Sequence, residues 1–161
     1  MIFQTEILDR VDHSYGIVSF YKMGLAIQQG DAEAFQKIFQ GILLRAVSSH
    51  DTADAESFYH GLMLGCALYY EQDYRVVSNR ERGHGRFDLA MIPKKQELPG
   101  IVMEFKTAES EESLERATGD ALQQMEERAY VTELKAAGAK SIWRYGIAFC
   151  KKHVLVKRGS N

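Results

Sequence analysis

Two short apolar runs decide the fold: RFDLAMI at residues 86–92 and IVMEFKT at residues 101–107, with the loop PKKQELPG between them. Side chains alternate between the two faces of a strand, so Asp88 lies on the same side as Ala90. In the second run, the same rule places Glu104 on one side with Lys106. Each run therefore carries a charge within apolar sequence, and burying a charge is costly unless it is paired or bound to a metal ion. The pattern indicates a chemical site on two neighbouring strands.

These residue types suit the hydrolysis of a phosphodiester bond. Two carboxylates can hold Mg²⁺ or Mn²⁺, which stabilises charge on a phosphate and lowers the pKa of a bound water. A lysine two residues beyond Glu104 points into the same site, where it can orient the water or stabilise negative charge. A Glu-x-Lys tripeptide alone is common and often forms only a solvated ion pair. The interpretation therefore rests on the order of both strands together.

The rest of the chain predicts helices and strands around these two runs. Helical spacing of apolar residues predicts helices over residues 31–48, with Asp31 as N-cap, and 55–71. A strand is expected at 74–78, then a charged helix over 109–137 that ends at Gly138, and closing strands at 141–149 and 153–157. Residues 17–20 fit either a short strand or the start of a helix. We expect a mixed α/β sheet flanked by helices on both sides.

The length of 161 residues and an ordinary globular composition predict a single domain with a substantial core. The net charge of −2 gives no general attraction to nucleic acid, so such binding needs a locally basic face. Cys66 and Cys150 are expected to be buried free thiols in a reducing compartment. The sequence contains no signal-peptide pattern and no apolar run of the ~20 residues that span a membrane, so we expect a cytoplasmic protein without membrane contact.

Several motifs in this order resemble a known family. SNRERGHGRFDLAMIP (78–93), GIVMEFKT (100–107), ALQQMEERAY (121–130) and YGIAF (145–149) resemble the PD-(D/E)xK nuclease-like domain found C-terminal to prokaryotic AAA-type ATPase-like proteins. ESFYHGLMLG (56–65) is similar to the first core helix of that family. The resemblance covers roughly residues 31–157, and it implies a nuclease-like domain over residues 31–161 preceded by an N-terminal extension over residues 1–30. It implies an α/β, restriction-endonuclease-like fold with the core order α-β-β-β-α-β. It also implies a nuclease whose activity depends on Mg²⁺ or Mn²⁺.

The resemblance also implies roles for single residues. The implied metal ligands are Glu56, Asp88 and Glu104, and the implied catalytic residues are Asp88, Glu104, Lys106 and Gln124. Gln123 is the competing register for the helix glutamine. Glu56 also fits a first-turn acid favoured by the helix dipole. His60 lies one turn after Glu56 and either lines the site or is a hydrogen-bonded, partly buried side chain.

The expected partner is nucleic acid, with DNA favoured over RNA. Arg80, Arg82 and Arg86 lie around the site strands and are the candidate phosphate contacts. A second basic group near the C-terminus (Lys151, Lys152, His153, Lys157 and Arg158) and the acids of residues 109–120 suggest a phosphate-binding face opposite an acidic face. The alternative is solvated surface charge without a partner.

The chain departs from the family in two respects. Phe87 stands at the position of the proline in the family's motif, and the 161 residues contain no phosphate-binding loop of an ATPase. Separately, the sequence has no dinucleotide fingerprint. No nucleotide cofactor is therefore expected. The alternative function is a catalytically silent nuclease-fold module that binds or regulates an ATPase partner, or associates with itself.

Overall fold

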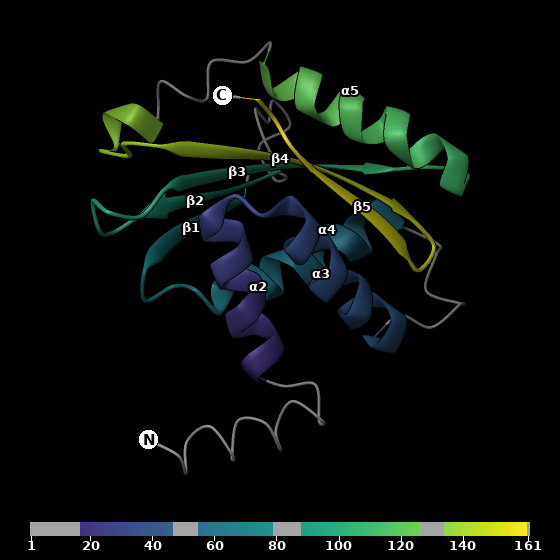
Figure 1. The fold of residues 1–161 in the computed structure, drawn as a ribbon, viewed down its shortest axis with the longest axis horizontal. Helices are drawn as coiled ribbons and strands as arrows, with labels where there is room; N and C mark the ends of the chain where they lie inside the picture. Colours follow the sequence, from purple (N-terminus) through teal and green to yellow (C-terminus); the bar gives the residue numbers. More distant parts are fainter. Residues whose placement is uncertain (1–16, 47–54, 79–87, 127–133, 161) are drawn as a thin grey trace.

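The computed structural model describes residues 17–46, 55–78, 88–126 and 134–160 (Figure 1). The elements follow in the order α2 (Ile17–Gln29), α3 (Ala32–Ala46), α4 (Ala55–Leu68), β1 (Tyr74–Ser78), β2 (Leu89–Pro93), β3 (Gly100–Thr107), the 3-10 turn η2 (Glu111–Ser113), α5 (Leu114–Glu126), β4 (Ile142–Cys150) and β5 (His153–Arg158). The order from α4 onward confirms the predicted α-β-β-β-α-β core, with β5 added at its end.

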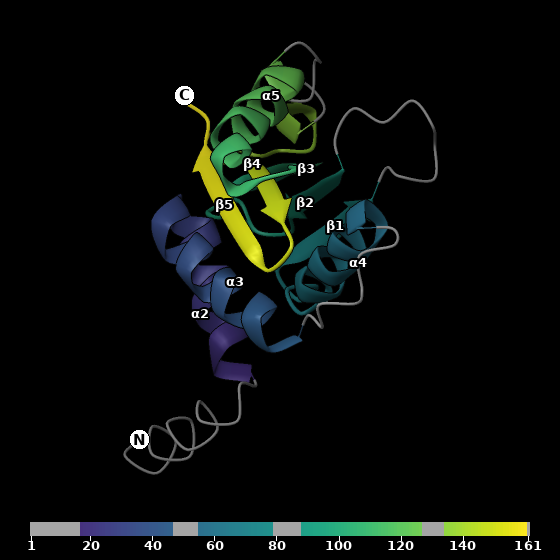
Figure 2. The same ribbon diagram turned by 90° about the vertical axis from the view of Figure 1, so that its right-hand side faces the viewer.

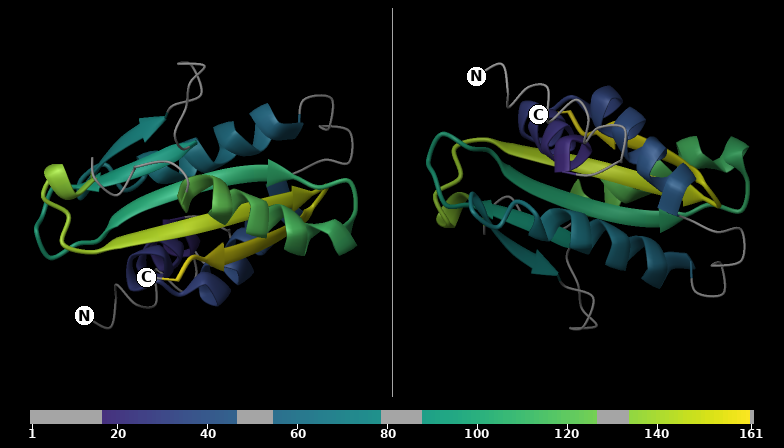
Figure 3. Two further views of the ribbon diagram at one scale, coloured as in Figure 1. Left: turned by 90° about the horizontal axis from the view of Figure 1, so that it is seen from above. Right: turned by 90° about the horizontal axis from the view of Figure 1, so that it is seen from below.

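The strands form one mixed sheet in the order β1-β2-β3-β4-β5. β3 and β4 run parallel, whereas the other neighbouring pairs are antiparallel. Parallel neighbours need a crossover connection, which here contains α5. Figure 1 shows α5 on one face of the sheet and α2, α3 and α4 on the other, and the two views of Figure 3 look onto these faces in turn. The prediction of helices on both sides is confirmed.

Alternation along β2 and β3 divides the core between the two faces. Leu89 of β2 and Met103 of β3 are fully buried in the main core, which α2, α3 and α4 complete. Val102 points the other way and packs with Met125 of α5 in a smaller cluster. The period of two in the sequence therefore predicts the faces of both strands correctly.

Residues 17–20 begin a helix rather than a strand. Helix α2 places Met23, Ala26 and Ile27 in the main core, together with residues of α3 and α4. The helix ends at a turn in which Gly30 has a φ of +74°. The division of the chain at residue 30 remains a prediction.

The helix boundaries follow local capping. The side chain of Asp31 accepts a hydrogen bond from the backbone N–H of Ala34 at 2.9 Å, so the predicted N-cap of α3 is confirmed. Helix α4 ends at Leu68, three residues earlier than predicted, and Tyr69 directly after it is exposed. Gly138 has a φ of +95°, as a helix-terminating glycine does.

The charged helix begins later than its sequence suggests. Residues 111–113 form the 3-10 turn η2, and α5 starts at Leu114. The hydroxyl of Ser113 accepts a hydrogen bond from the backbone N–H of Ser110 at 3.2 Å and donates one to the backbone oxygen of Ser110 at 2.8 Å. The two hydroxyl oxygens also lie 3.2 Å apart, and these contacts fix the chain before the helix. Residues 127–133 lie outside the described part of the chain, so the predicted continuation to residue 137 stays a prediction.

The edge strand β5 is covered by side chains of α3. Gln40 and Gln36, four residues apart on one helix face, accept hydrogen bonds from the backbone N–H groups of Val154 and Val156, both at 2.9 Å. Figure 2 shows α3 running beside β5. Unpaired N–H groups of an edge strand invite pairing with another chain, and these two glutamines satisfy both groups.

Both cysteines are buried free thiols, as predicted. Within the described ranges, no helix combines the length and the apolar character needed to cross a bilayer.

Candidate active site

Asp88 lies directly before β2, whereas the sequence pattern places it inside a strand. Its backbone N–H donates to the carbonyl of Met103 at 3.1 Å, and its Oδ2 accepts from the backbone N–H of Phe105 at 2.7 Å. A carboxylate oxygen thus takes the place of a backbone acceptor beside β3. This substitution explains why the regular ladder between β2 and β3 stops at Leu89, and it fixes the Asp88 carboxylate beside the middle of β3.

Glu104 is a buried acid in the centre of the sheet. Its side chain is only 5% exposed and lies on the face of the sheet that α5 covers. Oε1 of Glu104 accepts a hydrogen bond from the Nε2 amide of Gln124 on α5. A buried carboxylate is tolerated where such donors and a positive charge compensate for its lost hydration.

Lys106 supplies the positive charge. Its Nζ lies 3.9 Å from Oε1 of Glu104 and donates to Oε1 of Gln124 at 2.6 Å. The amide of Gln124 therefore joins the two residues: its NH₂ group faces the carboxylate and its oxygen faces the ammonium. The Lys106 side chain is 35% exposed, so its amine is within reach of a substrate.

The glutamine that contacts both charged residues is Gln124, and Gln123 is exposed on the same helix. The sequence left these two registers open. Helix α5 comes close because Gly146 of β4 lies next to Glu104 in the parallel pair. A Cβ at Gly146 would lie 2.6 Å from the carbonyl oxygen of Thr118 on α5. A glycine at this position therefore allows the approach that brings Gln124 to Glu104.

His60 of α4 lies on the opposite side of Asp88 and is buried. Its Nε2 is 3.2 Å from the backbone oxygen of Asp88 and 3.1 Å from the hydroxyl of Ser78. Its ring packs edge-on against Phe105, with 5.8 Å between centroids. Of the two readings of His60, the hydrogen-bonded buried side chain is the one observed. Its contact is with the backbone of Asp88, and helical spacing from Glu56 gives no signal for that.

Four of the predicted site residues cannot be placed. Glu56 belongs to α4, but its side chain lies outside the described part of the chain, and so do Arg80, Arg82 and Arg86. A third metal ligand and the basic cluster at the site strands therefore remain predictions.

Other basic residues are engaged by acids. Lys157 forms an ion pair with Glu115, and His153 lies 3.1 Å from Glu111. These contacts join the C-terminal basic group to the acids of η2 and α5, so the expected separation into a basic face and an opposite acidic face is wrong for these residues. The reason is that α5 also contacts β5, which the spacing of charges along the sequence does not indicate.

The donor set fits a hard divalent cation. Asp88 and Glu104 offer carboxylate oxygens, and Mg²⁺ is commonly bound through one or two carboxylates while it keeps several waters. Among the residues that the structure describes, no three His, Cys, Asp or Glu side chains come together as a ready ligand cage. A pair of carboxylates suits Mg²⁺ or Mn²⁺ better than Zn²⁺, which is usually held by nitrogen and sulfur ligands.

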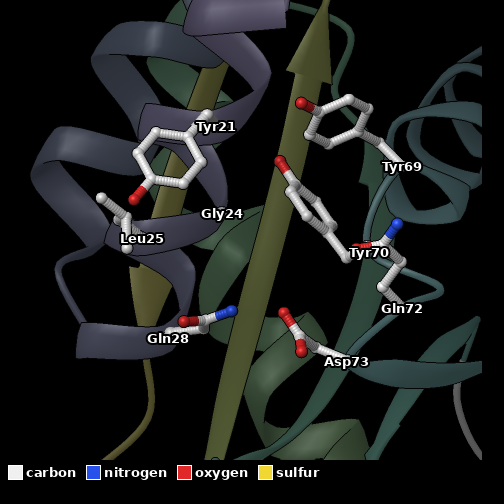
Figure 4. A pocket seen from close by; sticks show the side chains of 8 residues that line it. All are labelled: Tyr21, Gly24, Leu25, Gln28, Tyr69, Tyr70, Gln72 and Asp73. Carbon is white, nitrogen blue, oxygen red and sulfur yellow. The ribbon is translucent and has the colours of Figure 1, made fainter. Parts of the chain in front are cut away.

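A separate hollow of about 410 Å³ lies between α2 and the turn after α4 (Figure 4). Its lining residues are Tyr21, Gly24, Leu25, Gln28, Tyr69, Tyr70, Gln72 and Asp73. Its one acid, Asp73, pairs with Lys95 at 2.6 Å. This hollow therefore lacks the paired acids and the lysine of the Asp88 site.

The fold and the site together define a class: an α/β protein of restriction-endonuclease-like architecture, with one acid directly before β2 and a second acid and a lysine on the neighbouring strand β3. The model of the PD-(D/E)XK nuclease superfamily matches residues 54–159, which include every element from α4 to β5, and the chain belongs to this superfamily. No curated protein and no solved structure matches the chain. Helices α2 and α3 precede the matched region.

Proposed function

We propose that the protein hydrolyses phosphodiester bonds in nucleic acid, with DNA as the favoured substrate, in a reaction that depends on Mg²⁺ or Mn²⁺. The observation that carries the proposal is the group formed by Glu104, Lys106 and Gln124. A buried acid and a partly exposed amine are held close together by one amide, within the region that the superfamily model matches.

Asp88 and Glu104 would hold the metal ion, with Glu56 as a third ligand. When bound, the ion would neutralise charge on the scissile phosphate and lower the pKa of a water molecule. The hydrogen bond from the Phe105 backbone occupies one oxygen of Asp88, Oδ2, and thereby orients the carboxylate.

Lys106 would stabilise the negative charge that develops during the attack of water. Its ammonium group has three hydrogens, of which one bonds to Gln124. A phosphate oxygen or the attacking water would accept a hydrogen bond from another of these hydrogens. Gln124 would hold the amine in place and would also donate to Glu104, so that both groups keep one geometry during the reaction.

The partners and location are part of the same proposal. Arg80, Arg82 and Arg86 would contact phosphates of the substrate, which supplies the locally basic face that a chain of net charge −2 needs. A cytoplasmic location fits the two buried free thiols. An ATPase partner and self-association remain proposals from the resemblance.

The test is cleavage of labelled single-stranded DNA, double-stranded DNA and RNA with Mg²⁺, Mn²⁺ or EDTA. Glu104→Ala and Lys106→Ala are compared with wild type, after circular dichroism has shown that each variant folds. Glu112→Ala and Lys140→Ala are the matched controls, because they remove an exposed acid and an exposed lysine outside the site. We expect metal-dependent cleavage of DNA that falls at least about a hundredfold in both site variants and stays unchanged in both controls.

Cleavage that survives in both site variants would contradict the proposed site. The rival function, a silent module that binds an ATPase partner, predicts a different result. In that case no substrate is cut by wild type under any metal condition, although the protein is folded.

A further inference from the structure

His60 is a buried titratable side chain to which the proposed reaction gives no role. It is 7% exposed and belongs to α4, which packs on the sheet. Its polar contacts are with Ser78 of β1 and with Asp88 directly before β2. Nε2 reaches both the backbone oxygen of Asp88 and the hydroxyl of Ser78, at the end of β1. A histidine that only filled the core would not need these contacts, because an apolar ring fills the same space.

The contact with Asp88 defines the protonation of one ring nitrogen. A backbone carbonyl can only accept a hydrogen bond, so His60 donates to Asp88 in the tautomer that carries a hydrogen on Nε2, and this tautomer is the one that our inference uses. The hydroxyl oxygen of Ser78, at a similar distance from Nε2, can share this hydrogen or donate elsewhere. The carbonyl of Asp88, which lies outside the regular ladder of β2, thus receives a donor from a helix.

Three contacts form a closed set around Asp88. Phe105 holds the carboxylate of Asp88 through its backbone N–H, and its ring packs against His60. His60 in turn holds the backbone carbonyl of Asp88. With the bond from Asp88 N–H to Met103, the residue is therefore fixed at its amide, its carbonyl and its side chain.

We propose that His60 is a positioning residue, which holds the backbone of Asp88 so that the Asp88 carboxylate is preorganised for a divalent cation. This inference rests on the proposed function, in which Asp88 is a metal ligand. In this role His60 acts through the backbone of Asp88 and would not itself be a ligand of the cation. Groups that orient metal ligands affect affinity strongly, and their removal weakens metal binding by roughly 10- to 100-fold.

The experiment separates the hydrogen bond from the packing of the ring. His60→Phe keeps an aromatic ring against Phe105 and removes the donor, whereas His60→Gln keeps an N–H donor near the position of Nε2. Tyr145→Phe is the control, because it also removes a buried side-chain bond to a backbone carbonyl, from Tyr145 to Ile27 at 2.7 Å. That bond joins β4 to α2 and touches none of the site residues.

Two readouts are measured on the full chain, below the melting temperature of every variant. The first is the Mn²⁺ dissociation constant, from the electron paramagnetic resonance signal of free Mn²⁺. The second is the hydrogen-exchange rate of the Phe105 amide without metal, which reports whether the Asp88 carboxylate still accepts that hydrogen. We expect His60→Phe to weaken Mn²⁺ binding about tenfold and to speed exchange at Phe105. His60→Gln should recover both toward wild type, and Tyr145→Phe should change neither.

Equal effects of His60→Phe and Tyr145→Phe would overturn the inference, because they would show a general loss of stability. Unchanged Mn²⁺ binding and unchanged exchange in His60→Phe would overturn it as well. If wild type binds no Mn²⁺, the proposed function fails together with the metal-directed role of His60. Exchange at Phe105 would then still show whether His60 holds Asp88.

Discussion

The side chain of Gln124 links Glu104 and Lys106 through a hydrogen bond to each of them. Glu104 and Lys106 lie on the same strand face, and a pair of this kind on a solvated strand contributes little and exchanges freely with water. Here the acid is buried and the amide of Gln124 bonds to both groups. The amine is therefore held beside the acid by a hydrogen bond in addition to the attraction between the charges.

Replacement of Gln124 tests this role. Gln124→Ala removes both bonds, so the Lys106 amine loses its fixed position, and we expect the cleavage rate to fall about tenfold. Gln123→Ala is the matched control, since it removes the same side chain one position earlier on α5, where it is exposed. The measurement is the rate of DNA cleavage under single-turnover conditions. Equal rates in the two variants would show that Gln124 has no part in the site.

At the scale of the elements, the distance between α5 and the sheet determines whether Gln124 reaches Glu104. Gly146 of β4 is a point of close approach, where an added Cβ would lie 2.6 Å from the backbone oxygen of Thr118. Backbone atoms cannot move aside as a flexible side chain does. A larger residue at this position must therefore push the helix away from the strand next to Glu104.

Gly146→Ala should accordingly reduce both stability and activity. Overpacking at a close contact costs about 1–3 kcal/mol, and the displaced helix carries Gln124 away from Glu104. Gly119→Ala on α5 is the control, because a Cβ there meets no atom within 4 Å. That change should stabilise the helix by up to about 1 kcal/mol. Urea denaturation and cleavage rates measure both effects, and a Gly146→Ala protein with wild-type stability would contradict the packing argument.

At the scale of the whole molecule, local patterns predicted more than long-range contacts did. Alternation in the two central strands was sufficient to predict their faces, and Asp31 was predicted as a cap from its place before an apolar helix. The choice between Gln123 and Gln124 stayed open, because it depends on the rotation of α5 about its axis. That rotation is set by contacts such as Gly146 with Thr118, which are distant in sequence.

The same limit applies to His60 and to the C-terminal basic residues. His60 bonds to a backbone carbonyl 28 positions away, and Lys157 pairs with an acid 42 positions away. Neither contact is indicated by a periodic pattern in the sequence. Helix α2 was hard to predict for a related reason: its identity as a helix depends on apolar residues that pack into a core formed mostly by later elements.

The compact core should also protect its thiols. Burial raises the pKa of the Cys66 thiol to about 12, so hardly any reactive thiolate forms at pH 8. In a Cys150→Ala protein, where Cys66 is the only cysteine, we expect labelling by a disulfide reagent at pH 8 to be very slow until denaturant is added. Because the raised pKa favours the neutral thiol in the folded state, its contribution to stability is present below about pH 9 and is lost as the pH rises toward 12. Rapid labelling of the native protein would show that the core opens near α4.

Single-turnover cleavage of DNA in Mn²⁺ by wild type and by Glu104→Gln tests directly whether Glu104 belongs to a metal-dependent nuclease site. The substitution keeps the size of the side chain and removes the negative charge that would hold the cation. We expect cleavage by wild type that EDTA abolishes, and a loss of at least about a hundredfold in a folded Glu104→Gln protein. A Glu104→Gln protein that cuts at the wild-type rate would contradict the assignment of this site.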